Sequence, residues 1–228
     1  MPSSFDPQQL PVLASDGHLP GVAPHHLSLE ALRERFSRSP IWQPEVVAER
    51  RFVERPPAHA SVLVPLVMRD DGLRVLLTQR TDHLTDHPGQ ISFPGGRREA
   101  FDADDVATAL REAQEEIGLH PQHVDVLGTL PTYTTGTGFI VTPVIAGVRP
   151  GFEITADPFE VAEVFEVPLA FLMTPAHHRH HAVEVAGVRR EFLSMPWEGS
   201  DAQGQPRRYF IWGATAAMLR NLYRFLSA

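Results

Sequence analysis

The chain has 228 residues, 43% of them hydrophobic, which is enough to build one well-buried α/β core. Its formal net charge of -8 argues against a protein that binds long nucleic acids, because such proteins carry a basic face. The 20 basic residues are all Arg, whose guanidinium group suits bidentate contacts with phosphate, so a small phosphorylated ligand is compatible with this charge balance. Because the chain has no cysteine, disulfides, thiolate catalysis and cysteine-bound zinc are excluded.

The first residues, MPSSFDPQQLPVLASDG, lack the basic start and apolar core of a signal peptide. No apolar run approaches the roughly 18 residues that indicate a membrane span. We therefore expect a cytoplasmic protein whose partner is a small-molecule substrate, with no nucleic acid and no membrane span. A homodimer is compatible with this expectation.

The beginning of the chain differs in character from the rest. Residues 1–27 are rich in Pro, Ser and Gln without periodicity, which predicts an extended or poorly ordered arm. A short helix is expected from Leu29 to Phe36 with Ser28 as its cap, followed by a connector. We therefore divide the chain into an N-terminal arm with a short helix, 1–54, and one main domain, 55–228.

Strand-like runs begin after this connector. Ser61 to Val67 and Leu73 to Thr78 are apolar and are separated by a polar turn that ends at Gly72, which predicts a β-hairpin. Further strands are expected over 124–130, 139–148 and 161–167, and a second hairpin over 182–194 with its turn at Ala186-Gly187. A closing helix is expected over 214–226, with an apolar stripe formed by Ala214, Ala217, Met218, Leu222 and Phe225.

The clearest helix is expected from Asp104 to Ile117 and ends at Gly118, in the position favoured for a left-handed cap. Its core-facing stripe is formed by Val106, Leu110, Ala113 and Ile117. At roughly 100° per residue, three glutamates gather in one sector well away from that stripe: Glu112, Glu115 and Glu116.

Alone, such an acidic string is usually a solvated helix face. Clustered like charges repel each other mildly, however, and a divalent cation would remove that repulsion. Magnesium prefers oxygen ligands and completes its shell with water and substrate phosphates, so carboxylates on one rigid helix are a plausible platform for diphosphate chemistry.

The surroundings of the acidic string favour the metal interpretation. Gly96 is followed by five residues, Asp102, eight residues, and then the string from Arg111 to Leu119, REAQEEIGL. This arrangement closely resembles the Nudix box, whose pattern is Gly, five residues, Glu, seven residues, then Arg-Glu-apolar-x-Glu-Glu-x-Gly-apolar. Asp102 stands where the family usually has Glu, and the spacing to Arg111 is one residue longer.

A second segment resembles the coenzyme A diphosphatase subgroup of that family, which tolerates both departures. It consists of Leu76-Leu77-Thr78-Gln79-Arg80 followed by the run from His87 to Gly96, HPGQISFPGG. The likeness covers roughly residues 55–226. It implies a Nudix-type α/β/α sandwich with a mixed β-sheet, and hydrolysis of coenzyme A or acyl-CoA to adenosine 3′,5′-bisphosphate and phosphopantetheine or its acylated form.

The resemblance also implies roles for residues of the box. Glu112 and Glu116 are the expected ligands of Mg²⁺ or Mn²⁺, which would lower the pKa of a bound water and neutralise phosphate charge. Glu115 would share a metal or help to activate the water, and Arg111 would orient the carboxylates.

A base outside the box is an alternative, supplied by Glu160 or Glu163, although edge-strand solubility is the more usual role for both. For the aspartates at the helix start, Asp102, Asp104 and Asp105, helix capping is favoured over metal binding.

Substrate contacts are expected from Arg80, Gln90, Gly95 and Gly96. Each has a structural alternative, because Arg80 and Gln90 could serve as hydrogen-bonding residues of the fold and the glycines could only shape a turn. The cluster of His177, His178, Arg179, His180 and His181 is expected to be a solvated loop, since it has no acidic partner nearby in sequence.

Two rival functions are open. The first is another Nudix activity, on ADP-ribose, a nucleotide sugar or a dinucleoside polyphosphate. The second is a non-catalytic ligand-binding module of the same fold.

Overall fold

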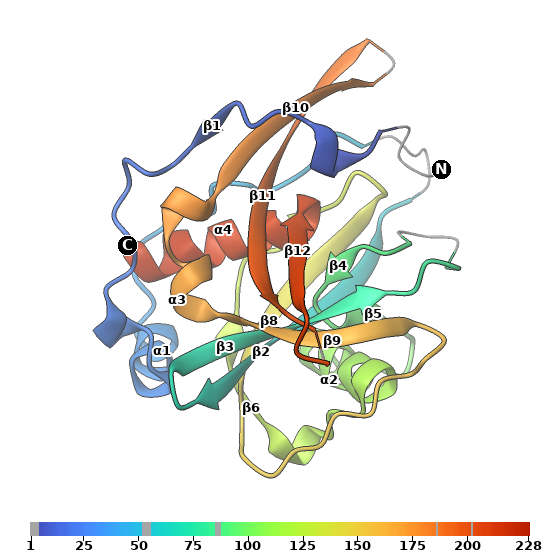
Figure 1. The fold of residues 1–228 in the computed structure, drawn as a ribbon. Helices are drawn as coiled ribbons and strands as arrows, with labels where there is room; N and C mark the ends of the chain where they lie inside the picture. The colour runs from blue at the N-terminus through green and yellow to red at the C-terminus, as the bar shows by residue number, and fades with distance from the viewer. Residues whose placement is uncertain (1–4, 52–55, 85–87, 186, 202) are drawn as a thin grey trace.

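Two long strands, β2 (Ala58–Arg69) and β8 (Phe139–Val148), pair in parallel at the centre of an eight-stranded sheet in this computed structural model (Figure 1). The structure describes residues 5–51, 56–84, 88–185, 187–201 and 203–228. The other strands of this sheet are β3 (Gly72–Arg80), β4 (Ile91–Ser92), β5 (Gly95–Arg97), β6 (Val124–Thr129), β7 (Tyr133–Thr134) and β9 (Val161–Pro168). The main order is β4-β3-β2-β8-β6, and β5, β7 and β9 pair with β2, β8 and β3.

All described pairings of this sheet other than β2 with β8 are antiparallel, so the sheet is mixed, as predicted. The strands expected over 124–130, 139–148 and 161–167 are confirmed within one residue at each end. The hairpin of β2 and β3 runs longer than expected at both ends. Its turn places Gly72 at a φ of 116°, a conformation that favours glycine.

A second, four-stranded antiparallel sheet was not predicted as such. It consists of β1 (Ala14–Ser15), β10 (Arg179–Val185), β11 (Val188–Ser200) and β12 (Pro206–Trp212), in that order. The expected hairpin over 182–194 is confirmed as the part of β10 and β11 next to their turn, and both strands extend beyond it. Ala186 of its turn, like His87 of the upstream motif and the boundary between 54 and 55, lies outside the described residues.

Four α-helices appear in the described part of the chain: α1 (Leu29–Ser37), α2 (Asp105–Ile117), α3 (Leu169–Leu172) and α4 (Gly213–Ser227). Short 3₁₀ turns, η1 to η4, occur at Pro7–Gln9, Pro24–His26, Pro121–His123 and Pro175–His177. The Ser28 hydroxyl caps α1 as predicted, accepting a hydrogen bond from the Ala31 N–H at 3.1 Å. None of the described helices is long and apolar enough to cross a membrane.

The eight-stranded sheet separates two hydrophobic cores. On one face, α2 packs Ala109, Ala113 and Ile117 against Leu63 and other buried strand residues. On the other face, α1, α3, α4 and the second sheet enclose a larger core that includes Leu32, Leu77, Met195 and Leu222. Figure 1 shows α2 and α4 on opposite sides of β2 and β3. The expected α/β sandwich with a mixed sheet is therefore confirmed, with an additional sheet on the α4 side.

The N-terminal arm is extended, which was one of the two alternatives predicted for it, and it is attached to the fold although most of its described residues are exposed or only partly buried. Its strand β1 pairs with β10 at the edge of the second sheet. The Tyr223 hydroxyl of α4 donates to the Pro20 carbonyl at 2.9 Å, and Asp16 lies 3.1 Å from the guanidinium of Arg220. Polarity and prolines could not show how the arm is attached, because its contacts are with β10 and α4, which are remote in sequence.

The histidine cluster is not a solvated loop, which corrects the prediction. His178 is fully buried, and its Nε2 lies 2.7 Å from the Leu172 carbonyl while its Nδ1 lies 3.0 Å from Nη1 of Arg220. His181 is 2% exposed and contacts the Ser194 hydroxyl and the Pro11 carbonyl. His178, just before β10, contacts α3 and α4, and His181 of β10 contacts the arm and β11, so their partners could not be read from the local sequence.

We predict that His178 makes the fold sensitive to acid. Burial, with a contribution from the Arg220 charge, lowers the pKa of His178 from 6.5 to about 4. The unfolded chain then binds the extra proton between these values, so stability is lost as pH falls through that window, by up to about 3 kcal/mol. Urea unfolding at pH 7.5 and 4.5 should show a larger loss for the wild type than for His178→Asn. Equal losses in the two proteins would contradict this role.

Candidate active site

The helix that carries the glutamates is capped firmly at both ends. The Asp104 side chain accepts from the Ala107 N–H at 2.8 Å, which confirms its predicted capping role. At the other end Gly118 adopts the predicted left-handed conformation, with a φ of 70°, and its N–H bonds to the Gln114 carbonyl at 3.0 Å. A Cβ at Gly118 would lie 3.1 Å from Thr155, so the following segment packs closely against the end of the helix.

Glu116 is the buried member of the acidic cluster, which corrects the expectation that all three glutamates lie well away from the core. Its side chain is only 6% exposed. One carboxylate oxygen accepts a hydrogen bond from the Gly95 N–H at 3.1 Å, and the other lies 3.6 Å from Nη1 of Arg80. Burial raises the pKa of Glu116 to about 7, and the nearby charges of Glu160 and Glu112 act in the same direction.

The two glycines before the box allow β5 to approach both β2 and α2. A Cβ at Gly95 would lie 2.4 Å from the Ser61 carbonyl oxygen and 2.6 Å from the Cα of Val62. A Cβ at Gly96 would lie 2.5 Å from a carboxylate oxygen of Glu112. Both positions therefore require glycine for close packing, and the Gly95 N–H also binds a site carboxylate.

Arg111 holds the helix, the preceding loop and two of the glutamates together. Its Nε and Nη2 bond to the two oxygens of Asp102, each at 2.9 Å, in a bidentate pair. Its Nη1 bonds to Glu112 and Glu115, each at 2.8 Å. The predicted orienting function of Arg111 therefore has the geometry it needs.

Asp102 does not cap α2, which corrects the capping role favoured from the sequence, because Asp104 is the N-cap and the Asp102 carboxylate binds other groups. Asp102 is 8% exposed, and besides Arg111 it accepts from the Glu99 N–H at 2.8 Å and the Thr108 hydroxyl at 3.1 Å. These bonds, with that to Arg111 first, hold the pKa of Asp102 far below its usual value. The neighbouring Asp105 binds the Thr142 hydroxyl at 2.7 Å.

The three glutamates of the cluster thus lie in different environments. Glu115 is 59% exposed and paired with Arg111, whereas the Glu112 side chain is 16% exposed. Burial raises the pKa of Glu112, while Arg111 opposes this effect and Glu115 and Glu160 add to it. Glu160 is one of the two carboxylates outside the box that the sequence analysis named as an alternative base. Its negative charge contributes to the raised pKa of both Glu112 and Glu116.

The carboxylate oxygens of Glu112 and Glu116 are suitable ligands for a hard divalent cation. Glu112 and Glu116 are carboxylates taken out of water without a full counter-charge, and a metal ion would supply that charge. As the side chains stand, no three acidic or histidine groups of the described residues are close enough together to hold an ion. Glu112 and Glu115 instead point to Arg111. Holding a metal would require Glu112 to turn away from Arg111.

The remaining candidates are placed on both sides of the sheet. Arg80 reaches Glu116, while its backbone N–H bonds to the Gln90 carbonyl at 3.0 Å. Gln90 also lies beside the start of α4, 3.8 Å from a Cβ built at Gly213. Glu163 is not a solubilising edge residue, because it lies 2.8 Å from Arg207 and accepts from the Tyr209 hydroxyl at 2.8 Å. The sequence did not indicate Arg207, since its role depends on the second sheet.

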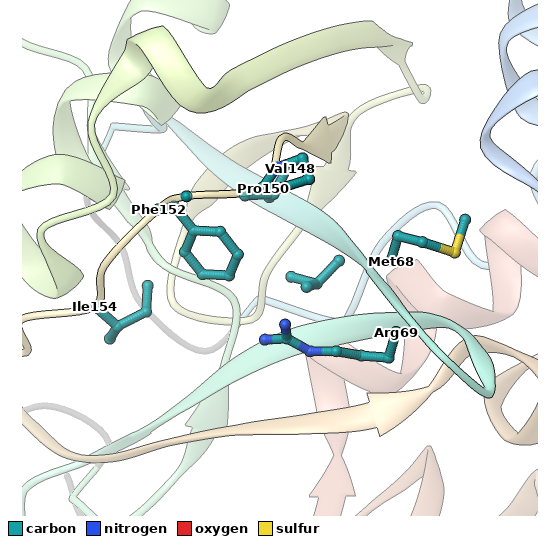
Figure 2. A pocket seen from close by; sticks show the side chains of 8 residues that line it. Met68, Arg69, Val148, Pro150, Phe152 and Ile154 are labelled. Carbon is teal, nitrogen blue, oxygen red and sulfur yellow. The ribbon is translucent and has the colours of Figure 1, made fainter.

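The described residues also form a hollow away from the glutamates. It has a volume of about 370 Å³ and lies beside the last residues of β2 and β8, where Arg69, Phe152 and Ile154 line it (Figure 2). The Arg69 guanidinium is already bound to Glu166 at 2.6 Å and lies over the Phe152 ring. We therefore place the candidate site at the Gly95–Gly96 turn and not in this hollow.

We predict that the glycines of this turn differ in how much stability they control. Gly95→Ala should cost about 1–3 kcal/mol, because its Cβ would meet backbone atoms that cannot move freely. Gly96→Ala should cost less, because the Glu112 carboxylate is the end of a flexible side chain. Gly17→Ala is the control, since its Cβ would find no atom nearer than 3.8 Å. Denaturant unfolding measures all three, and equal losses at Gly95 and Gly17 would refute the close packing.

Comparison with known proteins supports the resemblance seen in the sequence. The family model described as the NUDIX domain matches residues 57–186. A protein named "Uncharacterized Nudix hydrolase NudL" from Enterobacter sp. (strain 638) is 38% identical over 87% of this chain and 94% of its own length. One of the same name from Salmonella heidelberg (strain SL476) is 44% identical over 82% and 90%. The crystal structure of a Nudix hydrolase from M. smegmatis, RenU, is 23% identical, with a TM-score of 0.43, over 50% of this chain and 73% of that one. The chain belongs to the Nudix family and is a Nudix hydrolase.

Proposed function

We propose that this Nudix hydrolase cleaves the diphosphate bond of coenzyme A or acyl-CoA, giving adenosine 3′,5′-bisphosphate and phosphopantetheine or its acylated form. The observation that carries the hydrolytic site is the buried carboxylate of Glu116 beside the partly buried carboxylate of Glu112, beneath the Gly95–Gly96 turn. The segment from Leu76 to Gly96 supports the choice of substrate through its resemblance to the coenzyme A diphosphatase subgroup.

Glu112 and Glu116 would hold the divalent ion, Mg²⁺ or Mn²⁺, that Nudix hydrolases typically use. When bound, the ion lowers the pKa of a coordinated water and offsets the negative charge that develops on the diphosphate. The chain itself keeps Glu116 in place through the Gly95 N–H and keeps water from most of this side chain. Arg80, 3.6 Å from Glu116, is in position to contact a phosphate oxygen once Glu116 is neutralised by the ion.

Two glutamates are candidates for the base that takes the proton from the attacking water. Glu115 lies on the helix and is exposed, but its carboxylate is bound to Arg111 at 2.8 Å. Glu160 lies outside the box, where its carbonyl accepts from the N–H of Thr81, the residue after Arg80, at 3.0 Å, and its charge contributes to the raised pKa of Glu112 and Glu116. A carboxylate already bound to a guanidinium is a weaker proton acceptor, so we favour Glu160.

The alternative substrates share the same catalytic residues. A Nudix hydrolase of ADP-ribose, a nucleotide sugar or a dinucleoside polyphosphate would use the carboxylates of α2 in the same way and would differ in the residues that hold the rest of the substrate. A non-catalytic binding module is disfavoured, because Glu112, Glu115 and Glu116 of the box are all present.

Product analysis separates these alternatives. The purified protein is incubated with Mg²⁺ or Mn²⁺ and with coenzyme A or ADP-ribose in parallel. We expect metal-dependent release of adenosine 3′,5′-bisphosphate. Its rate should fall at least about 100-fold in Glu116→Gln, because the variant keeps the shape of the side chain but loses a metal-binding charge.

Glu153→Gln is the matched control, because Glu153 is exposed and lies outside α2. Its rate should equal that of the wild type. A larger loss of kcat in Glu160→Gln than in Glu115→Gln would support Glu160 as the base. Cleavage of ADP-ribose alone would refute coenzyme A as the substrate, and no turnover of either diphosphate would refute the proposed activity.

A further inference from the structure

A second hollow, of about 220 Å³, opens beside the four-stranded sheet. Its lining comes from α3, η4, β10, β11 and β12, and includes none of the candidate residues of the diphosphate site. The lining residues are Phe171, His177, Arg179, Pro196, Trp197, Glu198 and Arg208. The hollow is therefore separate from the carboxylates of α2, which lie across the eight-stranded sheet from this part of the fold.

Aromatic rings form one wall of this hollow. The rings of Phe171 and His177 stack with their centroids 4.0 Å apart and an angle of 19° between their planes. Trp197 meets Phe171 edge to face, with a centroid distance of 4.7 Å. Phe171 and Trp197 also pack against the main core, so this wall is held in place from behind. A fixed aromatic wall offers a planar ligand stacking at little cost in side-chain entropy.

Several hydrogen-bond donors that line the same hollow have no partner among the described residues. Among the described residues, the guanidinium groups of Arg179 and Arg208 make no hydrogen bond or ion pair, although Glu198 lies opposite Arg208 in the strand register. The imidazole of His177 and the indole N–H of Trp197 likewise have no hydrogen-bond partner in the part of the chain that the structure describes. The adjacent Arg207, by contrast, is bound to both Glu163 and Gln79.

The charges at the hollow contrast with those of the whole chain. Burial and the neighbouring Arg179 lower the pKa of His177, so its ring is neutral near pH 7. Two arginines and Glu198 then give the lining of the hollow one net positive charge, whereas the whole chain has a formal net charge of -8. General electrostatic attraction would therefore not bring an anion here, and binding would depend on the two guanidinium groups.

We propose that this hollow is a second ligand site, which binds a small anion that carries a planar aromatic ring, of the class of a nucleoside monophosphate. The ring would lie against Phe171 and Trp197, and the phosphate would bind Arg179 and Arg208. The volume of about 220 Å³ is smaller than the roughly 300–1,000 Å³ of pockets for drug-sized ligands, which fits one ring system with part of the ligand left in solvent.

Calorimetric titration with AMP in the presence of EDTA tests this site, because chelation removes the metal that the diphosphate site would need. We expect saturable binding to the wild type. The double variant Arg179→Gln/Arg208→Gln should bind at least about tenfold more weakly, since charge-assisted hydrogen bonds to phosphate are lost. Arg149→Gln, which removes one positive charge from another exposed position, is a control for loss of charge elsewhere, and it should bind as the wild type does.

Two ligand controls and one spectroscopic signal decide the chemistry. Adenosine and inorganic phosphate should each bind at least about tenfold more weakly than AMP, because each retains only half of the contacts. AMP should also quench tryptophan fluorescence in the wild type and much less in Trp197→Phe. A Tm of the double variant equal to that of the wild type would confirm that the variant is folded.

The proposal would be overturned by an absence of saturable AMP binding at millimolar concentration, or by equal affinity of AMP for the wild type and the double variant. Phosphate binding as tightly as AMP would also overturn it, because the aromatic wall would then contribute nothing. None of these results depends on which diphosphate the enzyme hydrolyses.

Discussion

Burial of the Glu116 carboxylate beneath the Gly95 turn is the constraint on which the rest of the site depends. A carboxylate taken out of water is costly unless its charge is matched, and here one backbone N–H and an arginine at 3.6 Å match it only in part. Because Gly95 and Gly96 have no side chains, β5 can lie close to β2 and to the glutamates of α2. The caps at Asp104 and Gly118 fix the two ends of α2. The helix, the turn and the pairing of β5 with β2 are then one rigid unit, in which a bound cation would supply the missing charge.

Arg111 and Asp102 explain how the two departures from the usual Nudix box are accommodated together. A shorter acid precedes the helix, and one extra residue separates it from Arg111, yet the two side chains meet in a bidentate pair with both bonds at 2.9 Å. The same guanidinium holds Glu112 and Glu115, so the loop before α2 is tied to two of the glutamates. The three glutamates therefore differ in their contacts: the exposed Glu115 and the partly buried Glu112 both bind Arg111, whereas the buried Glu116 does not.

The parts of this arrangement that follow local rules could be predicted from the sequence, and those that depend on distant contacts could not. The periodicity of α2, the turn residues of the β2–β3 hairpin and the pattern around Arg111 gave the elements and the proposed site residues, and the family membership is confirmed. The burial of Glu116 was missed, because helical periodicity alone does not show that β5 covers that side of the helix. His178 and His181 were misinterpreted for a similar reason, since their partners Arg220 and Pro11 are remote in sequence. The arm was judged by its composition, whereas its order comes from pairing with β10.

Metal-dependent thermal stability tests the central role of Glu116 most directly, because it requires no knowledge of the substrate. A ligand that binds only the folded state at about 100 times its Kd stabilises by about 2.7 kcal/mol, which for a chain of this size raises Tm by about 5–10 °C. The account predicts that Mn²⁺ produces such a rise in the wild type and in Glu153→Gln, and little or none in Glu116→Gln. An equal rise in all three proteins would contradict the assignment of the buried carboxylate as the metal-binding group.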